Sequence, residues 1–197
     1  MFDPNFIGIY DDAISSTECD TIIKWSETND WWRGRFGDDE IDFTMKKAWQ
    51  ISTDVIEPPY YVQDIIRKGL NNSIVIYKET YSDVNRGAGC TWNVQSYYNI
   101  QKYDPGDGYY GLHCENDGIG SRNRVLAWMF YLNTVTDKGG TYFSSYDKTI
   151  KAKKGRLVIW PAYWTHSHKG IPSPTQTKYI ATGWYAYEVP CCNNSPT

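Results

Sequence analysis

The sequence lacks the features that would tie it to a membrane or to a nucleic acid. Its longest apolar run, residues 125–132, is far too short to span a bilayer. The net charge is −3 and no long basic run occurs, which argues against DNA or RNA as a partner. The first residues show neither the basic start nor the apolar stretch of a secretory signal. We therefore expect a cytoplasmic protein with no membrane and no nucleic-acid partner.

Histidines and paired cysteines are also scarce. The chain has three histidines, at positions 113, 166 and 168. Its five cysteines are irregularly spaced and form no C-x-x-C pair, so the sequence contains no cysteine-based metal motif. An odd number of such cysteines is typical of a reducing compartment, in agreement with a cytoplasmic location.

Aromatic residues, in contrast, are abundant, with 17 tyrosines and 9 tryptophans among 197 residues. Aromatic side chains pack well on pleated strands, so this composition favours a β-rich globular protein. A chain of this length is expected to form a single domain. We divide it into a helical support region over residues 1–90, a jelly-roll core over residues 91–189 and a tail over residues 190–197.

Two segments in the first part of the chain predict helices. Ser15-Ser16-Thr17-Glu18 has N-cap chemistry and begins a helix that ends near Asn29. Its buried face would hold Cys19, Ile22, Ile23 and Ser26. Pro58-Pro59 begins a second helix that ends between residues 77 and 80. Its buried face would hold Tyr61, Ile65, Ile66 and Leu70. Residues 30–49 are interpreted as a surface loop anchored by Trp31 and Trp32, and the two helices would brace one face of a sheet.

From residue 91 onward, β-branched and aromatic residues alternate with polar ones, which predicts short strands separated by Gly- and Pro-rich turns. The predicted strands cover residues 92–102, 109–115, 125–132, 142–143, 148–152, 156–160, 165–168 and 178–187. This pattern favours a mainly β fold with N-terminal helices, in which the strands form a sandwich or jelly roll.

His113 and Glu115 are candidate metal ligands because alternate side chains of a strand point to the same face. A third ligand from a later strand would complete a set of two histidines and one carboxylate, which is typical of non-haem Fe(II) oxygenases. His166 and His168 share a face by the same argument, and Asp117 shares the face of Glu115. Cys114 should point the other way, into the core.

Lys178 lies ten residues after His168, across a proline-rich turn. A hairpin there would place the two residues on adjacent strands. A buried cation near a metal needs an anion to neutralise it. A dicarboxylate cosubstrate would do this by binding the metal at one end and Lys178 at the other.

Five segments in a fixed order extend this pattern. They are Tyr103-Asp104-Pro105-Gly106 with Tyr110, His113 and Glu115; Arg124 with Tyr131-Leu132-Asn133; Gly139-Gly140-Thr141-Tyr142-Phe143; residues 155–161; and His168, Gly170, Pro172, Lys178 and Trp184. Together they resemble the 2-oxoglutarate- and Fe(II)-dependent dioxygenases, specifically the prolyl 4-hydroxylase-like branch, over residues 91–187. The chain departs from that family by having Glu115 where an Asp is usual.

The resemblance implies a role for each matching residue. His113, Glu115 and His168 would ligate Fe(II). Lys178 would hold the distal carboxylate of 2-oxoglutarate, and Tyr103 would hydrogen-bond the same cosubstrate. The residues implied to contact a peptide substrate are Tyr110, Arg124 and Trp184. His166 would be a structural neighbour of the site.

The implied fold is a double-stranded β-helix, and the implied activity is hydroxylation of a C–H bond. The cofactors would be Fe(II) and 2-oxoglutarate, with O₂ as cosubstrate and ascorbate as an optional addition. The substrate would be a prolyl residue of a peptide or protein. One alternative is the same chemistry on a free amino acid or small metabolite. Another is a non-catalytic jelly roll that binds carbohydrate on its tyrosines and tryptophans.

Overall fold

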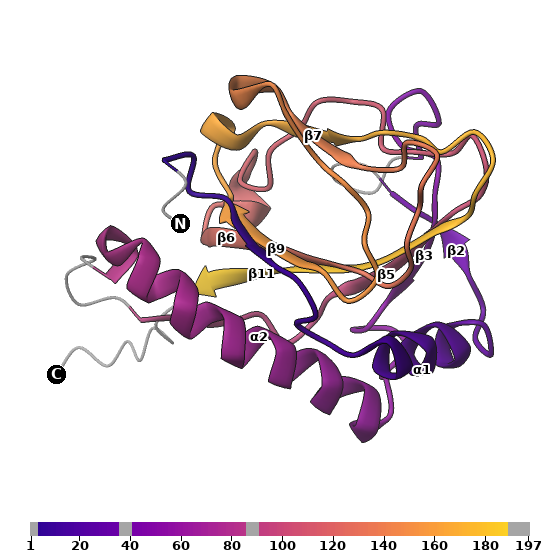
Figure 1. Cartoon of the computed structure of the whole chain (residues 1–197), viewed down its shortest axis with the longest axis horizontal. Helices are drawn as coiled ribbons and strands as arrows, with labels where there is room; N and C mark the ends of the chain where they lie inside the picture. Colours follow the sequence, from indigo (N-terminus) through magenta and orange to yellow (C-terminus); the bar gives the residue numbers. More distant parts are fainter. Residues whose placement is uncertain (1–3, 36–40, 86–90, 189–197) are drawn as a thin grey trace, which may run out of the picture.

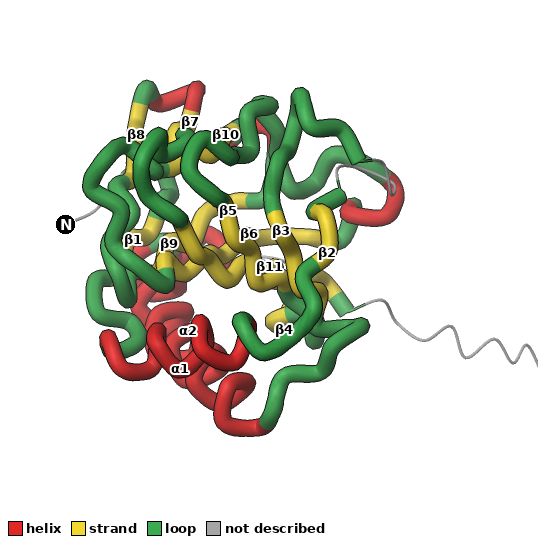
Figure 2. The backbone as a smooth tube through the Cα atoms, turned by 90° about the vertical axis from the view of Figure 1, so that its right-hand side faces the viewer, coloured by secondary structure: helices red, strands yellow, loops and turns green. Residues whose placement is uncertain are grey.

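Two antiparallel sheets and two helices form three layers in the computed structural model, which describes residues 4–35, 41–85 and 91–188. The helices cover one face of the larger sheet, and the smaller sheet lies on the other side, as Figures 1 and 2 show. The mainly β, jelly-roll fold expected from the sequence is therefore confirmed.

Within the described residues, the larger sheet has the order β1–β9–β6–β11–β5–β3–β2, and β4 also pairs with β11. Its strands are β1 (Gly8–Tyr10), β2 (Trp32–Arg33), β3 (Trp49–Ser52), β4 (Trp92–Val94), β5 (Asn99–Tyr103), β6 (Arg124–Tyr131), β9 (Leu157–Pro161) and β11 (Lys178–Tyr187). The smaller sheet has the order β10–β7–β8, with β7 (Thr141–Phe143), β8 (Lys148–Ile150) and β10 (His168–Gly170). Three strands of the larger sheet, β1, β2 and β3, come from the first ninety residues.

The central strand β6 explains why two separate cores form. Successive side chains of a strand point to opposite faces, so Trp128 and Phe130 pack under the helices while Met129 and Tyr131 face the smaller sheet. Residues 125–131 are buried throughout because both faces of the strand are covered. Strand β6 therefore lines one side of the space between the two sheets. Polar residues of the neighbouring strands β5 and β11 also point into this space.

Helix α1 (Ser16–Ser26) begins as the sequence predicts. Glu18 N donates to Ser15 Oγ at 3.2 Å, and Ser15 N donates to Glu18 Oε2 at 2.7 Å, which is a complete capping box. The helix ends three residues before Asn29. Cys19, Ile22 and Ser26 are buried as expected.

Helix α2 (Tyr60–Thr80) also has the predicted limits, but its buried face differs from the prediction. The buried residues are Val62, Ile66, Gly69, Leu70, Ser73 and Tyr77, whereas Tyr61 is 53% exposed. The row that starts at Tyr61 and Ile65 continues into the exposed Lys68, so it cannot stay buried. Gly69 lets the helix approach closely, because a Cβ there would lie 2.8 Å from Phe130 of the sheet.

Three predicted strands differ in the structure. The segment expected at 92–102 splits into β4 and β5. The segment expected at 165–168 begins with a 3₁₀ turn, Trp164–His166, before β10. Residues 109–115 do not form a strand, because they change partner along their length. Met45 O accepts hydrogen bonds from residues 110 and 111, His168 pairs with His113, and Ala162 O accepts from Glu115 N.

No helix in the described part of the chain combines the length and the apolar character needed to cross a bilayer.

Gly155 offers a test of how α1 is attached to the sheet. Gly155 has φ +80°, its carbonyl oxygen accepts from Ala13 N at 2.9 Å, and a Cβ there would collide with the carbonyl oxygen of Ile14. Gly106 has φ +87° but open space around it. We expect Gly106→Ala to lower the free energy of unfolding by about 1 kcal/mol from backbone strain alone. Gly155→Ala should cost roughly 1–3 kcal/mol more because of the collision.

Urea unfolding of the two variants measures this difference. Equal losses for both would show that the approach of the Gly155 turn to Ile14 is not a constraint on the fold.

Candidate metal and cosubstrate site

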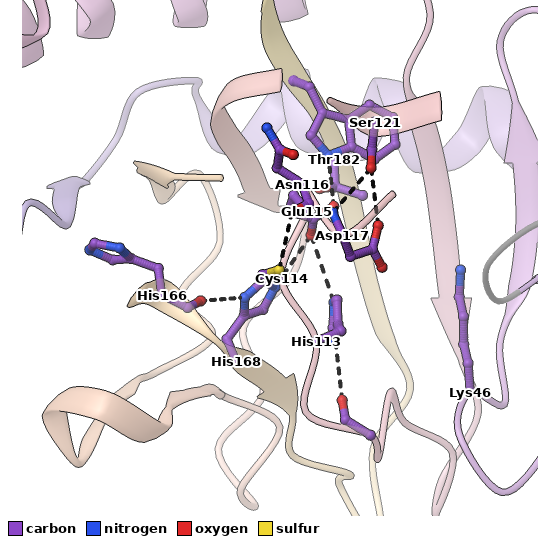
Figure 3. Close-up of polar contacts among 12 residues, drawn as sticks. Lys46, His113, Cys114, Glu115, Asn116, Asp117, Ser121, His166, His168 and Thr182 are labelled. Carbon is purple, nitrogen blue, oxygen red and sulfur yellow. Dashed lines mark hydrogen bonds and ion pairs between the residues drawn. The ribbon is translucent and has the colours of Figure 1, made fainter. Parts of the chain in front are cut away.

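The three predicted metal ligands converge at one end of the space between the sheets. His168 is the first residue of β10, and His113 pairs with it through two backbone hydrogen bonds of 3.0 and 2.9 Å. Glu115 Oε1 lies 3.3 Å from His168 Nε2 and 3.7 Å from His113 Nε2. The ligand atoms all lie within 4.8 Å of one another (Figure 3), so one cation can contact all three.

Backbone carbonyls set the protonation of both imidazoles. His113 Nδ1 lies 3.1 Å from Gly111 O, and His168 Nδ1 lies 3.0 Å from His166 O. Because a carbonyl oxygen can only accept, each Nδ1 carries the proton and each Nε2 presents its lone pair to the centre of the cluster. Two such lone pairs beside a carboxylate oxygen repel one another unless a cation lies between them, so this donor set fits a ferrous ion.

The second oxygen of Glu115 is held from the larger sheet. Trp184 Nε1 donates to Glu115 Oε2 at 2.7 Å, and Arg124 Nη1 lies 3.9 Å from the same oxygen. Arg124 Nη1 also donates to Glu115 O at 3.0 Å, and its guanidinium stacks 3.6 Å above the Trp184 ring. The structure therefore places Arg124 and Trp184, which the resemblance implied as substrate contacts, against the carboxylate.

Burial and hydrogen bonding act in opposite directions on the pKa of Glu115. Burial would raise this pKa, but protonation of His113 or His168 would give the carboxylate a charged hydrogen-bond donor, and this effect outweighs burial, so the pKa lies well below its usual range. Burial lowers the pKa of His113, and the neighbouring His168 lowers it further. Both effects keep the carboxylate ionised and the imidazole neutral, which are the forms that bind a metal.

Lys178 faces the same cavity from β11, where it lies opposite Tyr103 of β5. Its ammonium is 4.7 Å from the Tyr103 ring centroid, and the residue is 3% exposed. Among the described residues, Lys178 has no acidic partner, and burial lowers its pKa to about 8. A buried cation without an anion leaves room for a carboxylate of a ligand. Tyr103 donates its hydroxyl to Gln101 Oε1 at 2.6 Å.

The expected hairpin between His168 and Lys178 is not formed. His168 lies in the smaller sheet beside β7, whereas Lys178 lies in the larger sheet between β5 and β6. The two residues reach the same cavity, of about 670 Å³, from different sheets. The proline-rich turn connects the smaller sheet to the larger one. Sequence spacing cannot distinguish such a crossover from a hairpin, so it suggested that His168 and Lys178 lie on adjacent strands.

Four other residues considered in the sequence analysis do not join the ligand cluster. Asp117 is exposed, and its carboxylate accepts from Ser121 Oγ at 3.1 Å, away from the two imidazoles. The His166 side chain donates to Asn5 O at 2.8 Å, and only its backbone contacts His168. Tyr110 donates to Gly106 O and does not line the cavity. Cys114 is half-buried at the cavity wall rather than packed in the core, because its segment is not a regular strand.

Two cavity residues were missed from the sequence. Tyr109 stacks on the ring of His113, with centroids 3.6 Å apart and planes at 9°. The resemblance implied the next residue, Tyr110, instead of Tyr109. Lys46 is 5% exposed and lines the cavity, whereas Lys47 pairs with Asp107 at 2.8 Å outside it. Nothing in the local sequence distinguishes these two lysines.

The buried charge of Lys178 should reduce the stability of the ligand-free protein. We expect Lys178→Met to raise the free energy of unfolding at pH 7 by roughly 2 kcal/mol, because an uncompensated charge is replaced by an apolar group of similar shape. In the wild type, folded Lys178 loses its proton near pH 8, whereas the unfolded lysine keeps it to about 10.5. The free energy of unfolding of the wild type should therefore rise between pH 8 and pH 10.5, and the difference in stability between Lys178→Met and the wild type should shrink.

Urea unfolding between pH 7 and pH 10.5 measures this, with Lys24→Met on the exposed face of α1 as the control for lost charge. A gap that stays constant with pH would contradict the burial of an ionised Lys178.

Comparisons with known proteins agree with this geometry. The family model of the 2OG-Fe(II) oxygenase superfamily matches residues 98–186. Prolyl 4-hydroxylase subunits alpha-1 of Homo sapiens and Gallus gallus are 26% identical over 73 residues. That match covers 34% of this chain but only 14% of those longer proteins.

Solved structures share the fold at low sequence identity. The viral collagen prolyl hydroxylase of Paramecium Bursaria Chlorella virus-1, in its 2OG complex, has a TM-score of 0.64 and 21% identity, covering 96% of this chain and 99% of its own. A prolyl hydroxylase from Trichoplax adhaerens has a TM-score of 0.73 and 15% identity, and the match covers 93% of this chain and 84% of the other. A prolyl-4-hydroxylase from Pseudomonas putida has a TM-score of 0.69 and 13% identity, and the match covers 93% of this chain and 94% of the other. Residues 98–186 of the chain thus match the 2OG-Fe(II) oxygenase superfamily, and the chain resembles the prolyl 4-hydroxylase-like branch of that superfamily.

Proposed function

We propose that this protein is an Fe(II)- and 2-oxoglutarate-dependent hydroxylase that acts on a prolyl residue of a peptide or protein. One observation carries the proposal: two imidazole Nε2 atoms and a carboxylate meet in a cavity that also holds Lys178, a buried lysine that pairs with no carboxylate in the described part of the chain. The first three groups suit a ferrous ion, and Lys178 suits the distal carboxylate of the cosubstrate. The branch resemblance supports the choice of prolyl substrate.

A bound Fe(II) would let O₂ act as the oxidant, with one oxygen atom converting C–H to C–OH and the other entering 2-oxoglutarate, which would leave as succinate and CO₂. The protein's own residues position the reactants. His113 and His168 would bind through Nε2, and Glu115 through Oε1. Trp184 would keep the carboxylate from rotating by holding Oε2.

The walls around His168 exclude water from the reacting centre. The ring of Trp160 lies 5.0 Å from the His168 ring, and the ring of Phe143 lies 5.4 Å from it. Both aromatic residues are buried. On the opposite side, Tyr109 covers the face of His113. Apolar surroundings strengthen the electrostatic contacts inside the site and protect reactive species from side reactions.

The geometry supports enzyme chemistry over carbohydrate binding. A carbohydrate module would present exposed aromatic rings as platforms, whereas Tyr103, Tyr109 and Trp160 line the cavity beside the ligand cluster. The relatives favour a peptide substrate: one related structure is a collagen prolyl hydroxylase, and another holds a fragment of hypoxia inducible factor. Hydroxylation of a free amino acid or small metabolite uses the same residues and is decided by substrate screening.

The test is formation of succinate from 2-oxoglutarate with Fe(II), together with gain of one oxygen atom by proline-containing peptides or free L-proline, detected by mass spectrometry. We expect His168→Ala to abolish both, because one of three ligands is lost. His166→Gln should keep both, because the carbonyl that orients His168 remains in place. Absence of succinate for the wild type, with and without peptides, would overturn the proposed function.

A second prediction concerns Trp184. Trp184→Phe keeps an aromatic ring beside Arg124 but removes the N–H that holds Glu115, so we expect the affinity for Mn(II) or Co(II) to fall about tenfold. Trp160→Phe is a matched control, since its indole N–H has no hydrogen-bond partner among the described residues although the ring contacts His168. Metal titration followed by spectroscopy gives both affinities without turnover. Equal affinities for the two variants would mean that the Trp184 hydrogen bond does not position the ligand.

A further inference from the structure

A second buried lysine lies in the cavity, on the segment that leads into β3. Lys46 forms an isolated bridge with Tyr109, and its ammonium lies 5.4 Å from the Tyr109 ring centroid. Because Tyr109 stacks on His113, Lys46 lies one aromatic ring away from the metal ligands. Figure 3 shows its side chain apart from the ligand cluster, with no hydrogen bond or ion pair drawn to it. Neither the proposed iron ligands nor the implied cosubstrate contacts assign a role to this cation.

The ammonium of Lys46 has only neutral acceptors. It donates to Gln50 Oε1 at 2.9 Å and to Arg35 O at 3.2 Å, and no carboxylate of the described residues pairs with it. An ammonium has three N–H donors, so one remains for a ligand. Burial lowers the pKa of Lys46 to about 8, and Glu115 is the acidic group that opposes this shift. A metal on Glu115 would neutralise that charge and leave Lys46 without an anion.

Polar side chains connect Lys46 with the cosubstrate end of the cavity. Gln50 Oε1 also accepts from Gln101 Nε2 at 3.0 Å, and Gln101 Oε1 accepts from the Tyr103 hydroxyl at 2.6 Å. Tyr103 in turn lies under the ammonium of Lys178. The two glutamines therefore separate the two lysines, so each can bind a different anion. Lys178 is the one assigned to 2-oxoglutarate.

Part of the cavity rim is open to solvent and apolar. Trp32, Ile41 and Val55 line the same cavity and are 48%, 53% and 60% exposed. Arg33 and Arg35 line it as well, so cationic groups are concentrated there. Two acidic residues, Asp54 and Asp117, also line the cavity but are exposed, where water screens their charge. A substrate that enters here meets a buried ammonium beside an apolar rim.

We propose that Lys46 binds a carboxylate of the substrate and makes the site selective for an acidic substrate. The inference rests on the proposed function and deepens it by naming a feature of the substrate. The carboxylate belongs either to the amino acid that is hydroxylated or to an acidic side chain next to it in a peptide. In both cases the ligand supplies a charge-assisted hydrogen bond that no carboxylate of the described residues makes with Lys46.

Binding of matched ligand pairs tests the proposal. The first pair is L-proline and L-prolinamide, and the second is an acetylated, amidated Glu-Pro peptide and its Gln-Pro counterpart. Dissociation constants are measured by tryptophan fluorescence at pH 6.5 on protein loaded with Mn(II) and 2-oxoglutarate without O₂. We expect the wild type to bind the carboxylate-bearing member of one pair at least about tenfold more tightly. The pair that shows the preference identifies the source of the carboxylate.

Lys46→Met should abolish this preference, and Lys46→Arg should retain part of it because the positive charge remains. Lys47→Met is the matched control, since Lys47 is bound to Asp107 outside the cavity. The dissociation constant of 2-oxoglutarate should change less than about twofold in Lys46→Met, as Lys178 remains. Equal affinities within both pairs for the wild type would overturn the proposal. A selective loss of 2-oxoglutarate binding in Lys46→Met would overturn it too, by assigning the residue to the cosubstrate.

The binding measurements also separate this inference from the proposed function. Succinate formation without any carboxylate preference would leave the hydroxylase intact and remove the role of Lys46. A carboxylate preference without succinate formation would do the reverse.

Discussion

The single backbone pairing between His113 and His168 is the contact on which the site depends. It joins the segment that follows β5 to the first residue of β10, with hydrogen bonds of 3.0 and 2.9 Å. His168 also pairs with Phe143 of β7, and Gly170 N donates to Tyr109 O at 2.8 Å, so these contacts fix the ligand segment against the smaller sheet. The bridge brings the two imidazoles to a centroid distance of 4.3 Å and directs both Nε2 atoms toward Glu115.

The carboxylate shows how neighbouring strands adapt to a longer side chain. Glu115 has one more methylene than the aspartate usual in the family, and that added length would let it rotate away from the metal. Trp184 on β11 holds the second oxygen at 2.7 Å, and Arg124 on β6 holds the backbone oxygen at 3.0 Å. These two residues are stacked on each other. The larger sheet therefore determines the orientation of a ligand that lies outside it.

Charge distribution in the cavity sets a balance between stability and binding. Lys46 and Lys178 are both buried, and burial lowers the pKa of each to about 8. An uncompensated ammonium in such a place is unfavourable for folding. Two hydrophobic cores, one under the helices and one between the sheets, offset that cost. Ligand anions would then find cations that are already desolvated and in position, which reduces the free-energy cost of binding.

Several features were determined by the sequence alone because their causes are local. The capping residues Ser15 and Glu18 begin α1, and the continuous apolar run at residues 125–132 predicts β6. Residue type and spacing also singled out the three groups that converge in the cavity. Tertiary structure alone decided the rest. Whether Tyr109 or Tyr110 faces the site, whether Lys46 or Lys47 is buried, and what Arg124 and Trp184 hold depend on strands that are distant in sequence. Spacing along a chain describes one segment, whereas a cavity is formed where segments from different sheets meet, so only the packed fold could place these residues.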